Sequence, residues 1–257
     1  MLKNKKIIAQ LGLLIIALIW GATFLIVKDV LIEPYNCPPF IFAALRFALA
    51  SVCIVFFLDF KSMRKNFLGP TLCGIVLFIG YGFQNYGLEA TTPVPSAFIT
   101  SFSVLLVPVI LYIFRIEQIS LRIWISVFLA FIGIQMISPH GFNIGDQLTF
   151  GCALSFAIHI IMQDKFDKSK IINFFFIQST VAALLSFLAF LAIENLDNVL
   201  FFIDIKENGI DIIDIISSKV VLAVVITGIL GTTFALLVMI WAQKILSASE
   251  TAIVIAM

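Results

Sequence analysis

The sequence is poor in charge. Only 12% of its 257 residues are Asp, Glu, Lys or Arg, whereas 61% are hydrophobic. A soluble domain usually carries about 25% charged residues, so this chain has too little charge to cover a surface that faces water. Its net charge of +1 gives no basic excess for binding nucleic acid. These two absences exclude a soluble globular protein and indicate a chain that is solvated by lipid.

Recognisable catalytic and cofactor motifs are also missing. The sequence contains no GxxxxGK[ST] phosphate loop, no HExxH and no GxSxG. Its four cysteines form no CxxC pair and no metal-ligand spacing. No pair of carboxylates lies in the middle of an apolar run. We therefore expect no ATP hydrolysis, no enzymatic activity or catalytic residue, no cofactor and no bound metal.

The sequence has instead long, continuous apolar runs. A helix of roughly 20 apolar residues spans the hydrocarbon core, and only helices or closed barrels satisfy their backbone groups there. The runs do not alternate apolar and polar residues, which favours helices. The sequence predicts an all-α multi-pass membrane protein with spans at about 7–27, 38–58, 67–88, 94–114, 121–138, 147–163, 171–193 and 218–242, and a ninth that begins near Ser249.

The connectors between these spans differ in charge. Alternate connectors hold 12 of the 16 Lys and Arg residues, and the opposite set holds 10 of the 15 acidic residues. Cytoplasmic connectors carry the excess of Lys and Arg. The pattern predicts a multi-pass protein of the cell (inner) membrane, with the N-terminus and the loop at 164–170 in the cytoplasm. The acidic loop at 194–217 is then outside.

Two joints between spans are similar to each other. Residues 86–98 align without a gap with residues 241–253, and in both stretches an aromatic residue, a polar turn and small residues follow in that order. The third span runs outward and the eighth inward, so two units of five helices would have opposite orientations. Inverted repeats of this kind are typical of secondary transporters, whose substrate site lies between the repeats.

Four features of the spans form a recognisable series: Leu18-Ile-Trp-Gly-Ala-Thr-Phe in the first span, Ala44-Leu-Arg-Phe-Ala-Leu-Ala in the second, the joint at 85–100, and Pro108 in the fourth span followed by Glu117. In their order and spacing they resemble the motifs of EamA-type permeases of the drug/metabolite transporter superfamily. The resemblance implies a ten-helix permease made of two inverted five-helix repeats, at residues 1–143 and 144–257. It also implies the rest of a ninth helix and a tenth, so we expect a C-terminally incomplete chain with about 40 residues to follow.

The expected function is that of a secondary transporter, which moves a small organic metabolite by alternating access without hydrolysing ATP. The alternative is a non-transporting truncated membrane protein, or a subunit that needs a partner to complete the second repeat. The expected partners are membrane lipid and the substrate. A coupling proton or ion and a homodimer are left open, and nucleic acid is not expected.

Two ionisable residues lie inside the predicted spans. Arg46 is the only clearly intramembrane charge, and an arginine at the centre of a helix costs about 2.5–3.5 kcal/mol on insertion scales. It should therefore face protein or a wet cavity, where it either holds an anionic substrate group or bonds to carbonyls and locks the second helix. His159, mid-way along the sixth span, either relays a proton or bonds to a neighbouring helix as a neutral imidazole.

Polar and aromatic residues of three other spans complete the candidate substrate-binding set. Three of them occupy positions i, i+3 and i+4 of the third span and so share one face. They suit recognition of a polar small molecule, or else bond between helices and anchor the membrane interface. The same alternatives apply to the residues from the first and fourth spans. The full set is Trp20, Thr23, Arg46, Tyr81, Gln84, Asn85, Thr100 and His159.

Overall fold

The computed structural model describes residues 2–63, 66–116, 143–168, 170–194 and 219–255, with isolated residues between 117 and 142. Every regular element in these ranges is helical. The elements are α1 (Leu2–Leu31), α2 (Pro39–Ile54), η1 (Val55–Phe57), α3 (Phe60–Met63), α4 (Leu68–Ala90), α5 (Pro93–Ser101), α6 (Ser103–Ile113), α8 (Ile144–Lys165), α9 (Ile171–Ile193), α12 (Lys219–Ile226), η4 (Thr227–Phe234), α13 (Ala235–Ala242) and α14 (Ala248–Ile255).

The helices agree closely with the predicted spans, and the prediction of an all-α multi-pass membrane protein is confirmed. Six described segments are long and apolar enough to cross a membrane: Asn4–Leu31, Pro39–Phe57, Pro93–Ile113, Ile144–Lys165, Ile171–Ile193 and Lys219–Ala242. The 23 residues of α4 also suffice in length, at about 35 Å. The predicted fifth span at 121–138 and nearly all of the acidic loop at 194–217 lie outside the described residues.

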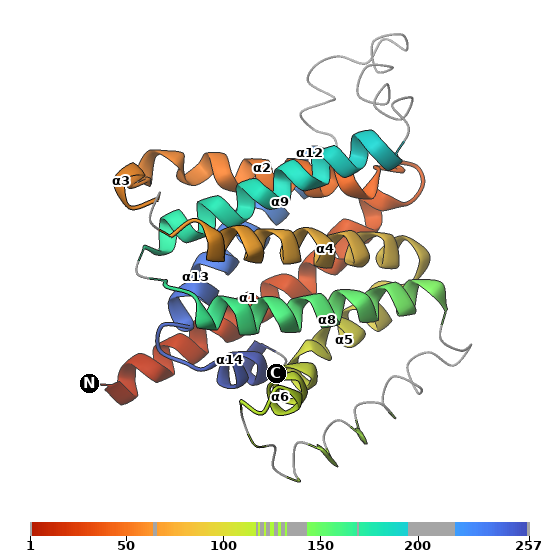
Figure 1. Cartoon of the computed structure of the whole chain (residues 1–257). Helices are drawn as coiled ribbons and strands as arrows, with labels where there is room; N and C mark the ends of the chain where they lie inside the picture. The colour runs from red at the N-terminus through yellow and green to blue at the C-terminus, as the bar shows by residue number, and fades with distance from the viewer. Residues whose placement is uncertain are drawn as a thin grey trace.

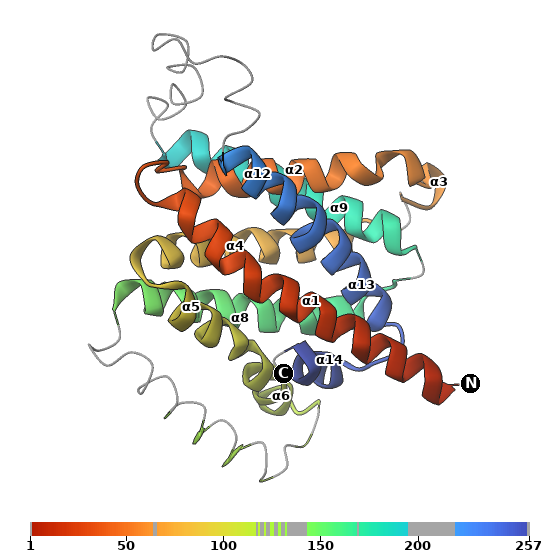
Figure 2. The same ribbon diagram turned by 180° about the vertical axis from the view of Figure 1, so that it is seen from behind.

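Four helices form a layer in the spatial order α2, α9, α4 and α8 (Figure 1). On one face of this layer, α1 and the continuous run α12–η4–α13 cross it diagonally side by side (Figure 2). The short helix α14 packs against α1 and α6. Because α9, from the second half of the sequence, contacts both α2 and α4 from the first half, the two halves are intermixed rather than separate.

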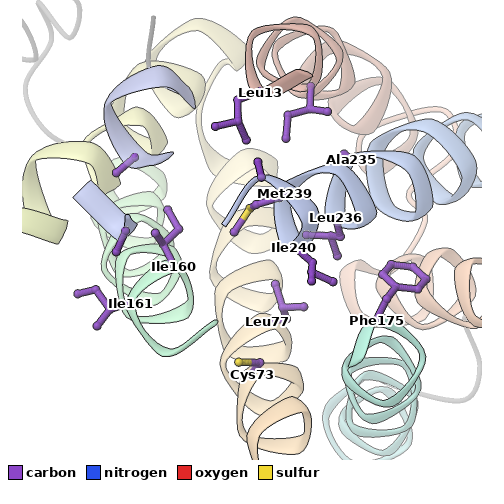
Figure 3. Packing of buried hydrophobic residues seen from close by; sticks show 14 of the residues in the cluster. Leu13, Cys73, Leu77, Ile160, Ile161, Phe175, Ala235, Leu236, Met239 and Ile240 are labelled. Carbon is purple, nitrogen blue, oxygen red and sulfur yellow. The ribbon is translucent and has the colours of Figure 1, made fainter. Parts of the chain in front are cut away.

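The apolar core lies between the crossing helices and the layer. Leu236, Met239 and Ile240 of α13 extend toward Leu77 of α4 and Phe175 of α9 (Figure 3). All five side chains are buried. Fully burying a Leu, Met or Phe side chain contributes about 1.5–3 kcal/mol, although in a bilayer the close packing matters more than escape from water. These contacts pack α13 against the layer of helices.

A close crossing joins the end of α4 to the beginning of α8. A Cβ atom added to Gly145 would lie 2.6 Å from the carbonyl oxygen of Gly87 and 2.7 Å from the backbone nitrogen of Thr91. At the same point, Asn143 and Asp146 form a capping box, each side chain accepting a hydrogen bond from the backbone N–H of the other. Oγ1 of Thr91 donates to Oδ1 of Asp146 at 2.7 Å. This crossing fixes how α4 and α8 lie against each other.

Ion pairs join the polar connectors. Lys6 contacts Glu250 at 3.0 Å, and Lys170 contacts Asp59 at 3.1 Å. All four residues belong to the connector set that is rich in Lys and Arg. The pairs therefore indicate that these connectors gather at one end of the helix bundle.

Candidate functional site

A cavity of about 480 Å³ lies between the crossing helices, the layer and the α5–α6 segment. Small-molecule sites usually have volumes of about 300–1,000 Å³, so the cavity can hold a metabolite. Of the eight candidate residues, seven line it, and they come from five different spans. These seven are Trp20, Thr23, Arg46, Tyr81, Gln84, Thr100 and His159.

Arg46 of α2 is 2% exposed, and its guanidinium is held from two directions. Nε donates to Oγ1 of Thr232 at 2.6 Å, and Nη2 donates to the carbonyl of Gly231 and to the hydroxyl of Tyr81, both at 3.3 Å. The guanidinium carbon lies 4.6 Å from the centre of the Tyr81 ring, within cation–π range. Within the described ranges Arg46 has no carboxylate partner. Arg46 thus both locks α2 against η4 and lines the cavity.

The segment that receives Arg46, η4, is π-helical. Its Thr232 hydroxyl donates to the carbonyl of Thr227 at 2.9 Å, and Nε1 of Trp20 donates to the carbonyl of Gly231 at 2.7 Å. A Cβ on Gly231 would lie 3.1 Å from Nη2 of Arg46, so glycine allows the guanidinium to approach this closely. π-Helical turns often occur at functional sites. Sequence reasoning did not connect Thr232 and Gly231 with Arg46, because a π turn leaves no mark on hydropathy.

The three polar residues of α4 separate in the structure. Tyr81 and Gln84 line the cavity, whereas Asn85 does not. The Asn85 amide donates instead to the carbonyl of Pro39 in α2 at 3.1 Å, since one step along a helix turns a side chain by about 100°. Gln84 has no hydrogen-bond partner in the described part of the chain, so its amide is available to a ligand.

His159 of α8 lines the cavity and bonds to a side chain of α9. It is buried, and its Nε2 is 3.2 Å from Oε1 of Gln178, so this side-chain bond links α8 to α9 across α4. Behind it, Nε2 of Gln163 donates to Oε1 of Gln243 at 2.6 Å, and Nε2 of Gln243 donates to the carbonyl of Ile160 at 3.1 Å. Sequence reasoning missed these glutamines, although the position of Gln163 and Gln178 in apolar spans was an available signal.

The fourth span is broken where it meets the cavity. Helix α5 ends at Ser101 and α6 begins at Ser103, and both serines line the cavity beside Thr100. The Ser101 hydroxyl donates to the carbonyl of Phe98 at 2.6 Å, a bond of the kind that bends helices. In α1, the Thr23 hydroxyl makes a similar bond at 2.7 Å, to the carbonyl three residues earlier.

The cavity wall is almost entirely neutral. Arg46 is the one charged side chain among the described residues that line it, and the others are apolar, aromatic or neutral and polar. No group of three His, Cys, Asp or Glu residues in the described ranges lies close enough together to hold a metal ion. Apolar walls with a few placed polar groups are suited to reversible binding of a small molecule.

Fold and cavity together define a multi-pass α-helical membrane protein with a cavity of metabolite size between its spans. The model of the EamA-like transporter family matches residues 7–138 and again residues 143–257. The chain belongs to this family, which confirms the resemblance seen in its motifs. Membership indicates a transporter rather than an enzyme.

Individual relatives agree with this assignment. An "Uncharacterized transporter" of Archaeoglobus fulgidus is 34% identical over 258 residues, which cover 98% of this chain and 75% of the relative. An "S-adenosylmethionine uptake transporter" of Rickettsia bellii is 30% identical over 155 residues, 56% of this chain and 52% of the relative. A crystal structure with 16% identity covers 96% of this chain and 83% of its own, with a TM-score of 0.68, so the two share a fold.

Proposed function

We propose that this protein moves a small organic metabolite across the membrane by alternating access, without hydrolysing ATP. The observation that carries the proposal is the cavity of about 480 Å³, which gathers seven polar or aromatic side chains from five spans. Trp20, Thr23, Arg46, Tyr81, Gln84, Thr100 and His159 are then the substrate-binding residues. Asn85 is left out of this set because it holds α4 to α2.

Two oppositely oriented repeats, at residues 1–143 and 144–257, would supply the movement. Rocking of one repeat against the other exposes a site at their interface to each side in turn. We place the Lys- and Arg-rich connectors and the N-terminus in the cytoplasm of an inner-membrane protein. His159, at the cavity wall and bonded to Gln178, is the residue through which a proton would be coupled.

The substrate of the Rickettsia relative is not carried over to this chain. That match covers only 56% of the chain. S-Adenosylmethionine carries a sulfonium cation, and no acidic residue in the described cavity wall offers it a counter-charge. The proposal therefore includes transport of a small metabolite but does not include S-adenosylmethionine as the substrate.

Solute exchange in liposomes tests the proposal. The protein, expressed from its full reading frame, is reconstituted into liposomes that are loaded with a small-molecule cell extract. Mass spectrometry then follows the exchange of each metabolite against isotope-labelled extract outside. We expect selective exchange above that of empty liposomes without added ATP. No exchange from a folded, monodisperse preparation would refute the proposal.

A matched pair of variants connects exchange to the cavity. Gln84→Leu removes an amide that bonds to nothing else in the described ranges, so it leaves no protein group unpaired. One hydrogen bond contributes about 0.5–1.5 kcal/mol, and we expect exchange to fall about 2- to 12-fold. Lys61→Gln, at an exposed position of the short helix α3, is the control and should exchange at the wild-type rate. Equal exchange rates in the two variants would show that the cavity does not bind the transported substrate.

A further inference from the structure

The charge in the cavity is not balanced by the protein. Arg46 is buried and lines the wall, yet its partners Thr232, Gly231 and Tyr81 are all neutral. A buried charge without a counter-charge is costly. Among the described residues of the wall there is no Asp or Glu to supply one. An anion bound in the cavity would supply it.

One nitrogen of the guanidinium is left for such an anion. Nε and Nη2 are occupied by η4 and Tyr81, whereas Nη1 has no hydrogen-bond partner in the described part of the chain. Arginine has five N–H donors, and two of them are on Nη1. Because the other bonds already hold the guanidinium, its free nitrogen is preorganised and needs no reordering when a ligand binds. Hydrogen bonds from a guanidinium to a carboxylate are among the stronger ones in proteins.

The rest of the wall sets the character of the ligand beyond its charge. Leu77, Phe156, Leu236 and Met239 face the cavity from three helices. Such a surface accepts an aliphatic or aromatic body and gives a second charged group no partner. Gln84, with its free amide, can bond to one neutral polar group of the ligand.

We infer that the cavity takes a small organic monoanion, whose carboxylate binds Nη1 of Arg46 while its apolar body lies against the neighbouring wall. This inference rests on the proposed function and specifies the substrate class of the same site. It distinguishes an organic acid from cationic metabolites and from ligands whose charge is borne by an ammonium group alone. We expect a zwitterion to bind more weakly than an organic acid and more tightly than a cation, because only its carboxylate finds a partner.

Compounds with one shape and different charge test the inference on the wild-type protein. The probes are 3-phenylpropionate, 3-phenylpropanamide, 3-phenylpropylamine and phenylalanine, and their binding is measured in detergent by microscale thermophoresis. We expect the carboxylate to bind at least about tenfold more tightly than the amide or the amine, since a bond to a charged group contributes about 1.5–3 kcal/mol. An amine or amide that binds as tightly as the carboxylate overturns the inference. So does the failure of all four to bind up to their solubility limits.

Two variants test whether Arg46 is the residue that causes the preference for a carboxylate. Arg46→Gln should lower carboxylate affinity at least about tenfold and amide affinity by much less, because only the carboxylate carries a charge that balances the guanidinium. Gln84→Leu, which keeps Arg46, should retain the preference for carboxylate over amide even where overall affinity falls. Because the wild-type ranking already tests the inference, it does not depend on Arg46→Gln folding. A folded Arg46→Gln protein that keeps the preference overturns the inference.

The liposome experiment separates this inference from the proposed function. Exchange of cationic or neutral metabolites, without a preference for anions, would support the proposed transport activity and overturn the inference of an anion site. Carboxylate binding that depends on Arg46, without any exchange in liposomes, would support the inference of an anion site and overturn the proposed transport activity. Exchange of organic anions that is lost in Arg46→Gln supports both.

Discussion

The crossing of α4 and α8 gives the sharpest test of the packing. In Gly145→Ala, the new Cβ would lie 2.6 Å from the carbonyl oxygen of Gly87 and 2.7 Å from the backbone nitrogen of Thr91, whereas ordinary contacts begin at 3.4 Å. The obstructing atoms belong to the backbone, so no side chain can rotate away and the two helices must separate. Overpacking of this kind costs about 1–3 kcal/mol.

A second effect of the substitution has the opposite sign. Alanine is favoured over glycine by about 1 kcal/mol in a helix interior, and by less near the first turn, where Gly145 lies. The net expectation for Gly145→Ala is a loss of about 1–2 kcal/mol. For a chain of this size that lowers the melting temperature by about 2–8 °C. Thermal unfolding in detergent, followed by tryptophan fluorescence, measures the change.

Gly21→Ala is the matched control in the same assay. A Cβ at Gly21 meets nothing within 4 Å in the described structure, so the variant should unfold at the wild-type temperature or up to about 4 °C higher. If Gly145→Ala proved as stable as Gly21→Ala, α4 and α8 would not approach as closely as the structure has them. The reasoning about their crossing would then be refuted.

Three further single variants and one double variant test individual contacts by chemical denaturation. Lys6→Ala should lower the free energy of unfolding by at most about 0.5 kcal/mol, because its ion pair with Glu250 is half exposed. Glu250→Ala should cost about 1 kcal/mol, because Glu250 also forms a capping box with Ser247. Equal losses would contradict the capping role. Gln178→Leu should cost about 1–3 kcal/mol, since Nε2 of His159 loses its partner. The double variant with His159→Leu should recover part of that loss. Simple additivity of the two single changes would show that the bond contributes nothing.

The sequence alone was sufficient for the membrane-spanning helices that the structure describes. Whether a stretch of 20 residues enters lipid depends on its own hydropathy and on the need to pair its backbone internally, and both are local properties. The run at 171–193, for example, is the same helix in the structure, α9. The motifs around Trp20, Arg46 and the third span were enough to place the chain in its family.

Several features could not be derived in this way, because they depend on what lies opposite a side chain. Gln84 and Asn85 are adjacent and chemically alike, yet one faces the cavity and the other bonds to α2. The π-helical turn of η4 exists in the structure together with the guanidinium that bonds to it, and Gly231 permits that approach. Gln178 could not be connected with His159 before the structure placed their side chains 3.2 Å apart, since α4 lies between α8 and α9.

Hydropathy therefore determined which of the described segments are helices in lipid. The charges of the connectors predicted which side of the membrane each connector lies on. The tertiary structure decided which face of each helix borders the cavity and which partners remain for Arg46. The physical reason is range: insertion is a property of one segment, whereas a binding site is formed by side chains from several helices. Their directions are fixed by the rotation and spacing that close packing imposes.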